Sequence, residues 1–429
     1  MFEVFHRLRP ALETGNWLNR RRVTAYAAIL LAFEVITFLF IVAGTHGWIV
    51  PLKEPNTTDF VSFYAAGSLA DQGNAQAAYD PVRHLAAEVA ATEPGIKHVI
   101  FVYPPVFTLI CSLFARLPYL VAFTLFELLT LIPCLWVMRR IALGPARRAR
   151  DWKDFIPLLA FPAVAIDIGI GQNALLTAAL FGGGSLLVDR RPFAAGLLFG
   201  ALCYKPHFGL LIPIALIAAW RWRAVAGAAV SALALVALSG AVLGWDSWQA
   251  FIVALTGSHT TYESGQVDFA AFVSSFGAVR LMGGSPALAY AVQAMASVAA
   301  AALVAVVWRR NLSLPVRAAT LASATLVALP LALFYDFMMA GIAMAWLVRQ
   351  ARQTGFLPWE KLLLAGVFVT PMLARGVGTS LHLPVATIAC FALLGLTAVR
   401  AWREDRLARE ARCVPGGSLA APMPVLVAG

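Results

Sequence analysis

Long apolar segments that alternate with short basic clusters constrain this chain more than any other feature of its sequence. The first such segment covers residues 24–44 and is long enough to cross a bilayer as a helix. Because the membrane interior offers no partners for backbone N–H and C=O groups, spans of this kind must be helical. With 60% hydrophobic and 13% charged residues among its 429, the chain is predicted to be an all-α polytopic membrane protein.

The formal net charge of +11 comes from Lys and Arg residues that lie mostly at the ends of apolar segments. This placement is typical of cytoplasmic loops in membrane proteins, whereas a nucleic-acid-binding protein gathers its cations along one polar face. The sequence therefore argues against a nucleic-acid partner and for a surrounding of membrane lipids. The five cysteines lack the paired spacing of a zinc site or a disulfide framework, and we interpret four of them as small buried apolar residues.

Placing every basic cluster on the cytoplasmic side requires an even number of crossings between successive clusters. The apolar segments then divide into about twelve helices, with both termini in the cytoplasm. One membrane domain is predicted over residues 1–400, followed by a basic, disordered cytoplasmic tail over residues 401–429. The expected spans are residues 24–44, 119–138, 155–170, 173–188, 193–204, 208–220, 224–243, 286–307, 316–334, 337–349, 361–374 and 383–400.

Two long external segments follow from this arrangement, at residues 45–118 and 244–284. The first contains a polar stretch that leads to Asp59 and two segments with helical patterns. Its apolar run 105–117 is short and begins with prolines, so we expect it to lie in or dip into the outer leaflet. A carboxylate held beside a bilayer is costly, which makes Asp59 a candidate functional residue.

Other polar residues gather at three turns on the same predicted side as Asp59. Lys205 favours an anion-binding role, because a cation after an apolar run must snorkel or find an anion. Structural interpretations stay open, since Asp59 and Asp336 both suit helix caps, Asp80 suits a turn and His207 suits a satisfied structural histidine. The three turns contain Gln172 and Asn173, Lys205 and His207, and Tyr335 and Asp336.

An enzyme that transfers a group from a lipid phosphate donor needs a base and a cation at its active site. A carboxylate and a lysine beside one cavity provide them. The carboxylate accepts the proton of an acceptor hydroxyl, and the cation holds the departing phosphate. Enzymes that use nucleotide sugars commonly have an Asp-x-Asp metal site, and this chain has no such triplet. We therefore expect a metal-free reaction with a lipid-linked donor and no cofactor.

At these residues the chain resembles glycosyltransferase family 87, the polyprenyl-phosphate-sugar-dependent membrane transferases of the GT-C fold, which include α-mannosyltransferases. The resemblance implies a GT-C-like bundle with juxtamembrane helices in the first external loop. It also implies inverting transfer with Asp59 as general base, and Gln172 and Lys205 at the donor head group and phosphate. The matching residues are Thr58-Asp59-Phe60, Tyr64, Gly73, Tyr79-Asp80-Pro81, Tyr103-Pro104-Pro105, Gly171-Gln172, Gly196, Gly200 and Lys205-Pro206-His207.

The predicted protein is a membrane glycosyltransferase that moves a mannose-like hexose or a pentose from a polyprenyl phosphate to a lipid or glycan acceptor. Its active site is expected on the periplasmic side of the cell inner membrane. Asn173 and His207 join the donor-binding candidates, and Asp80, Tyr103, Tyr335 and Asp336 are further candidates. The alternative is a multi-span transporter or flippase of a lipid or solute, which the lack of a clear internal repeat disfavours. Some mannosyltransferases of the family have a histidine near the site where this chain has Tyr335-Asp336, which weakens the implication of mannose specificity.

Overall fold

The computed structural model describes residues 9–45, 58–144, 151–257, 262–310 and 312–412. Within them the secondary structure is helical apart from one isolated bridge between Phe272 and Leu333, which confirms the all-α prediction. The α-helices are α2 (Arg20–Ala43), α3 (Phe60–Asp71), α4 (Pro81–Ala91), α5 (Pro105–Ala115), α6 (Tyr119–Leu143), α7 (Ile156–Leu159), α8 (Pro162–Ile170), α9 (Ala174–Leu187), α10 (Pro192–Ala201), α11 (Leu211–Ala218), α12 (Trp222–Leu243), α13 (Trp245–Gly257), α15 (Ser275–Leu281), α16 (Pro286–Arg309), α17 (Leu314–Ala328), α18 (Met338–Thr354), α19 (Glu360–Leu381) and α20 (Val385–Arg412). Short 3-10 helices are η1 (Ala75–Tyr79), η2 (Trp152–Phe155), η3 (Leu202–Tyr204), η4 (Pro206–Gly209), η5 (Phe269–Ala271) and η6 (Phe334–Phe337).

Six helices of the described residues are long and apolar enough to cross a membrane on their own, namely α2, α6, α12, α16, α19 and α20. Shorter apolar helices, among them α9, α10, α11 and α17, lie within other predicted spans. The chain is therefore a polytopic membrane protein, and the number of about twelve crossings stays a prediction. Helix α20 continues to Arg412 instead of ending near residue 400, so the predicted tail begins as helix. Residues 413–429 of that tail, and residues 46–57 of the first external segment, lie outside the described residues.

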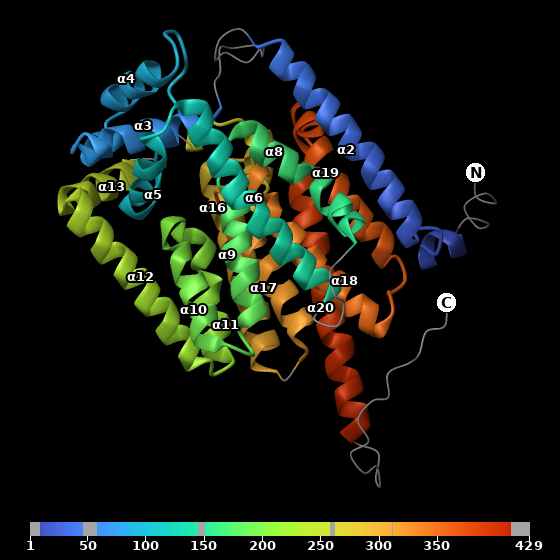
Figure 1. Ribbon diagram of the computed structural model, residues 1–429. Coiled ribbons are helices and arrows are strands. Elements are labelled where there is room, and N and C mark those ends of the chain that lie inside the picture. The colour runs from blue at the N-terminus through green and yellow to red at the C-terminus, as the bar shows by residue number, and fades with distance from the viewer. Residues whose placement is uncertain (1–8, 46–57, 145–150, 258–261, 311, 413–429) are drawn as a thin grey trace.

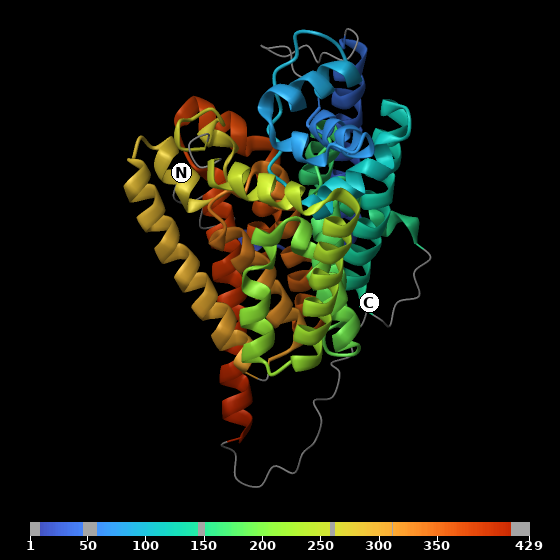
Figure 2. The same ribbon diagram turned by 90° about the vertical axis from the view of Figure 1, so that its left-hand side faces the viewer.

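The segment predicted to be external, residues 45–118, contains α3, α4 and α5, which gather with α13 at one end of the bundle (Figures 1 and 2). Helix α5 is 11 residues long and packs closely against α3. A Cβ on Gly67 of α3 would lie 2.4 Å from the carbonyl oxygen of Cys111 in α5, so only glycine permits this approach. The aromatic rings of Phe60 and Phe63 pack against those of α5 and α6, which anchors the start of α3.

Helices α10 and α12 touch through glycines that the sequence analysis had singled out. A Cβ on Gly196 would lie 2.1 Å from the carbonyl oxygen of Ala224, and one on Gly200 would lie 2.2 Å from that of Ala228. Small residues four apart let membrane helices approach until their backbones meet. The contact fixes the end of α10, from which η3 leads directly to Lys205.

Helices α17 and α18 form the centre of the bundle, and every residue of α17 after Leu314 is buried. A helix that is buried on all its faces belongs in the interior of a large protein or membrane bundle. The short connection between them contains η6, so the central pair presents Tyr335 and Asp336 near the end where α3 lies.

Candidate active site

A cavity of about 1190 Å³ is lined by α2, the start of α3, α8, α19 and the connection η6. Side chains from the first external segment and from all three predicted outer turns line it, although sequence separates them by up to several hundred residues. The cavity therefore brings together most of the candidates that the sequence had placed on one side of the membrane. Those that line it are Asp59, Tyr103, Gln172, Lys205, His207, Tyr335 and Asp336.

A tight backbone contact sets the position of Asp59. Its N–H donates to the carbonyl oxygen of Ile170 at 2.6 Å, at the end of α8. The next residue, Gly171, has a φ of +76°, and a Cβ there would lie 2.8 Å from the Cβ of Phe60. Glycine is thus required both for the left-handed turn and for the close approach. The same turn brings Gln172 beside Asp59.

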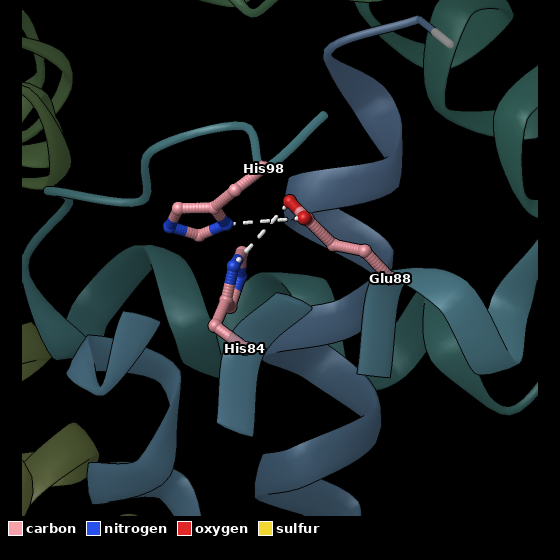
Figure 3. Close-up of side chains that lie close together, drawn as sticks. All are labelled: His84, Glu88 and His98. Carbon is pink, nitrogen blue, oxygen red and sulfur yellow. Dashed lines mark hydrogen bonds and ion pairs between the residues drawn. The ribbon is translucent and has the colours of Figure 1, made fainter. Parts of the chain in front are cut away.

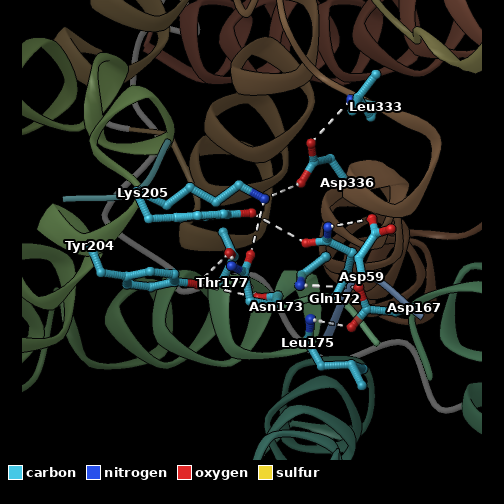
Figure 4. A network of polar contacts seen from close by, with 12 residues as sticks. Asp59, Asp167, Gln172, Asn173, Leu175, Thr177, Tyr204, Lys205, Leu333 and Asp336 are labelled. Atoms are coloured by element: carbon cyan, nitrogen blue, oxygen red, sulfur yellow. Dashed lines mark hydrogen bonds and ion pairs between the residues drawn. The ribbon is translucent and has the colours of Figure 1, made fainter. Parts of the chain in front are cut away.

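The Asp59 side chain occupies the N-cap position of α3 but makes no capping hydrogen bond. Its Oδ2 accepts instead from Nε2 of Gln172 at 2.7 Å (Figure 4). The hydroxyl of Tyr103 donates to Oε1 of Gln172 at 3.2 Å, so this tyrosine orients the amide. The three side chains form a chain of hydrogen bonds that ends on a half-buried carboxylate in the cavity.

Burial raises the pKa of Asp59 to about 6, and the hydrogen bond from Gln172 limits that rise. Nearby charge acts in both directions, because Glu88 raises the pKa further and Arg375 lowers it. A carboxylate with such a pKa is mostly ionised at neutral pH yet is a stronger base than an exposed aspartate. Asp59 is therefore suited to accept a proton.

Lys205 forms a buried ion pair with Asp336, with 2.6 Å between Nζ and Oδ1 (Figure 4). Its Nζ also donates to Oδ1 of Asn173 at 3.1 Å and lies about 5 Å from the centres of the Phe208 and Tyr335 rings. Asp336 uses its other oxygen to accept from the backbone N–H of Leu333. The Lys205 charge is thus balanced inside the protein, which its position in the sequence did not indicate.

A second layer of polar groups holds Asn173. The carboxylate of Asp167 accepts from the backbone N–H groups of Ala174 and Leu175 at 3.1 and 3.0 Å, which satisfies the start of α9. The hydroxyl of Tyr204 donates to the carbonyl oxygen of Asn173 at 3.2 Å. These contacts fix the turn between α8 and α9, and with it the amide that meets Lys205.

Arg375 and Glu34 are charged residues of the cavity that the sequence analysis missed. Arg375 of α19 lies over the Phe334 ring and 3.7 Å from a carboxylate oxygen of Asp268, with 58% of its side chain exposed. Glu34 of α2 lines the cavity as well, and neither carboxylate oxygen has a hydrogen-bond partner among the described residues. The sequence could have indicated both residues, because each stands inside a long apolar segment, where an ionisable residue is usually functional.

Asp80 differs from the other candidates in its position. It does not line the cavity, and its Oδ1 accepts from the backbone N–H groups of Val82 and Arg83 at 2.9 and 3.2 Å. Asp80 therefore acts as the N-cap of α4, in agreement with its interpretation as a turn residue.

The sequence model of glycosyltransferase family 87 matches residues 101–334, which is more than half of the chain. The chain belongs to glycosyltransferase family 87. It is accordingly a membrane glycosyltransferase, with a glycosyl donor and an acceptor as substrates. The match includes Tyr103, Gln172 and Lys205 of this transferase, whereas Asp59 and Arg375 lie outside it. No curated protein and no solved structure matches the chain.

Proposed function

We propose that this transferase moves a hexose or pentose from a polyprenyl phosphate to a lipid or glycan acceptor at the extracytoplasmic face of the cell inner membrane. The transfer inverts the anomeric centre, needs no metal at the reacting atoms, and uses Asp59 as general base. The observation that carries the proposal is the Asp59 carboxylate, whose pKa is raised to about 6, in a cavity shared with Lys205 and Arg375.

The proposed step is a direct displacement. Asp59 accepts the proton of an acceptor hydroxyl while the hydroxyl oxygen attacks the anomeric carbon. The bond from that carbon to the phosphate oxygen breaks, and the polyprenyl phosphate leaves with the electron pair. A base with a pKa near the working pH combines a large ionised fraction with a useful proton affinity. The amide of Gln172 aims the carboxylate, since Tyr103 holds the amide in turn.

Cations of the cavity bind the donor phosphate in this proposal. Lys205 uses two of its three N–H bonds for Asp336 and Asn173, which leaves one for a phosphate oxygen. Arg375 contributes a second positive charge, and its contact to Asp268 is loose enough to be exchanged for a phosphate. His207 and Asn173 are further donor contacts, of which His207 lines the cavity and Asn173 lies behind Lys205.

The cavity also has an apolar wall that suits the polyprenyl chain. Leu31, Phe38 and Ile41 contribute to it from α2, and Ile166 and Ile168 from the helix opposite, α8. Helix α2 has only one buried residue, Ala27, and crosses the outside of the bundle (Figure 1). A lipid in the surrounding bilayer thus meets an apolar passage beside α2 that leads to the charged groups.

The orientation follows from the distribution of positive charge. Clusters at Arg20–Arg22 and Arg139–Arg140 lie at the ends of α2 and α6 that point away from the α3 end of the bundle (Figure 1). Cytoplasmic loops carry the excess of Lys and Arg. The cavity end is therefore assigned to the extracytoplasmic side.

The test uses purified full-length protein in lipid nanodiscs, with synthetic polyprenyl phosphates that carry mannose, glucose or arabinose, and a membrane lipid extract as acceptor. Release of polyprenyl phosphate and formation of a new glycolipid are measured by mass spectrometry. We expect Asp59→Asn to lower the transfer rate by roughly a thousandfold, the range of general-base catalysis. The melting temperature should not fall, because the change removes a buried charge that destabilises the folded protein.

Asp80→Asn is the matched control, because it makes the same change at a carboxylate outside the cavity, and Asn caps a helix as well as Asp does. This variant should keep full activity. Transfer that persists in Asp59→Asn removes the base assignment. A protein that moves the lipid between leaflets without making a new glycosidic bond contradicts the proposed function.

A further inference from the structure

Three side chains with metal-binding atoms meet in the first external segment, beside the cavity. His84 and Glu88 lie one helical turn apart on α4, and His98 lies on the chain that follows this helix (Figure 3). His84 and Glu88 are fully buried, whereas 24% of the His98 side chain is exposed. One ligand atom from each of the three residues lies within 4.8 Å of the ligand atoms of the other two.

The hydrogen bond of His84 defines its tautomer. Nε2 lies 3.1 Å from the carbonyl oxygen of Ser62, and because a carbonyl only accepts, Nε2 carries the hydrogen. In the neutral ring Nδ1 then carries no hydrogen and has a free lone pair. This nitrogen has no hydrogen-bond partner among the described residues.

Nδ1 of His84 nevertheless points at a carboxylate. It lies 3.4 Å from Oε1 of Glu88, so two electron-rich atoms face each other in a buried place. The other carboxylate oxygen lies 3.1 Å from Nδ1 of His98. A hydrogen bond from the backbone N–H of Val99 also reaches the carboxylate, which fixes its orientation. A cation between the three groups resolves the repulsion.

The spacing fits a first-row transition metal. Zinc binds imidazole nitrogen and carboxylate oxygen at about 2.0–2.2 Å, so neighbouring ligand atoms of a tetrahedral site lie about 3.4 Å apart. The distances of 3.4 and 3.1 Å to the Glu88 oxygens match this value. Ligating histidines almost always donate their other N–H to a carbonyl or carboxylate, as His84 does to Ser62.

We propose that His84, Glu88 and His98 bind a zinc ion, with a water molecule as fourth ligand on the exposed side of His98. The ion has a structural role, since it ties the segment after α4 to that helix. This segment forms one wall of the cavity through His98, Val99, Ile100, Val102 and Tyr103. Because Tyr103 orients Gln172, the ion stabilises the position of the amide that contacts Asp59. The inference stands apart from the proposed transfer reaction and does not depend on the identity of the donor.

The test starts from full-length protein in detergent, stripped with a chelator and dialysed. Zinc is added, and the bound metal is measured by mass spectrometry after removal of the free ion. We expect one tightly bound zinc per chain, and Co²⁺ in its place should give the intense visible bands of a tetrahedral site. His98→Ala should weaken zinc binding by at least about a hundredfold, because even the loss of an outer-shell partner costs ten- to a hundredfold.

His382→Asn is the matched control, since it removes an exposed histidine outside the cluster at a position with a φ of +54° that asparagine tolerates. It should leave zinc binding unchanged. X-ray absorption of the zinc-loaded wild-type protein adds a readout that needs no variant, and it should show two imidazole ligands. The proposal is overturned if wild-type protein binds no more zinc than His98→Ala, or if the absorption spectrum lacks imidazole. The contacts of the Glu88 carboxylate with His98 and with the backbone N–H of Val99 then explain the cluster.

Discussion

The two ends of the helix bundle treat their charged residues differently. At the basic end, defined here by Arg139, Arg317 and Arg400, the guanidinium groups are buried and paired with carboxylates. Arg317, for example, lies 2.6 Å from Asp189, which precedes α10. At the cavity end, defined by the cavity-lining residues, Asp59 is held by a neutral amide, and no cation of the described residues lies within ion-pair distance of it.

The difference separates charges that hold the bundle together from charges that are available to a substrate. Buried ions need close partners, and the pair of Arg317 with Asp189 joins residues 128 positions apart in the chain. At the cavity end the folded protein keeps an imperfectly solvated carboxylate. The pKa of Asp59 rises from 3.8 to about 6, so this group lowers stability as the pH increases through that interval. The ionised carboxylate thus lowers the stability of the fold, which is expected for a group that acts on a substrate.

The largest expected effect concerns the basic end. Arg400 of α20 donates to both oxygens of Glu360 in α19, and to Thr354 and the carbonyl oxygen of Gly355. Arg400→Met leaves the Glu360 carboxylate buried without its partner, which costs about 3–5 kcal/mol of folding free energy. The melting temperature in detergent should therefore fall steeply, while the folded fraction should retain its transfer rate.

Arg406→Met is the control for that change. Arg406 lies on the same helix and pairs with Glu410 at 2.7 Å, but both side chains are more than half exposed. Surface pairs of this kind contribute about 0–1 kcal/mol, so the melting temperature should change little. If Arg400→Met abolishes transfer in protein that is still folded, the two ends are not separable in the way proposed.

An intermediate effect on stability and transfer is expected at Lys205 and Asp336. This ion pair is buried, like the pairs of the basic end, but it lines the cavity, so it tests the comparison of the two ends directly. Lys205→Met and Asp336→Asn should each lower the melting temperature, since each leaves the other group without its partner. The double variant should recover stability, because no uncompensated charge remains. Its kcat/KM for the donor should nevertheless stay roughly ten- to a hundredfold low, the value of a lost hydrogen bond between charged groups.

The four proteins are compared by melting temperature and by transfer rates at several donor concentrations. A rate that recovers together with stability in the double variant assigns the pair to the structure alone. A rate that stays low while stability recovers assigns Lys205 to the donor phosphate.

The sequence predicted the fold better than the contacts of the site. The bilayer and the water around it determine where apolar segments and basic clusters stand in a sequence, so the helices could be predicted without coordinates. The three turns that were predicted to share one side do line one cavity. The segment 155–170 shows the limit, because Pro162 divides it into α7 and α8. The pairing of Lys205 with Asp336 joins residues 131 positions apart, and no periodicity reports such a contact.

Some of the residues that the sequence analysis missed could have been recognised from their sequence context, and others could not. Arg375 and Glu34 stand in long apolar segments, where an ionisable residue is itself an indication of function. His84 and Glu88 have the one-turn spacing of metal ligands on a helix. His98 completes that cluster only through the path of the chain after α4, and sequence alone gives no measure of that path.

The smallest expected effect lies within the cavity end and concerns the pH dependence of transfer. A general base must be ionised, so kcat/KM should fall as the pH drops through the pKa of Asp59, about 6. The hydrogen bond from Gln172 lowers this pKa, and Gln172→Met, which is close in shape, removes it. The acid limb should then move to higher pH by up to about one unit, because one hydrogen bond is worth about 0.5–1.5 kcal/mol.

The rate at pH 7 should consequently fall by less than about tenfold and recover by pH 8, where Asp59 is ionised in both proteins. Gln72→Met, at an exposed glutamine outside this cavity, should leave the whole profile in place. A limb that does not move, or that moves to lower pH, contradicts the role of the amide. A rate that stays low at every pH has a different meaning: Gln172 then positions a substrate, and the contrast with the basic end rests on binding geometry instead of on the ionisation of Asp59.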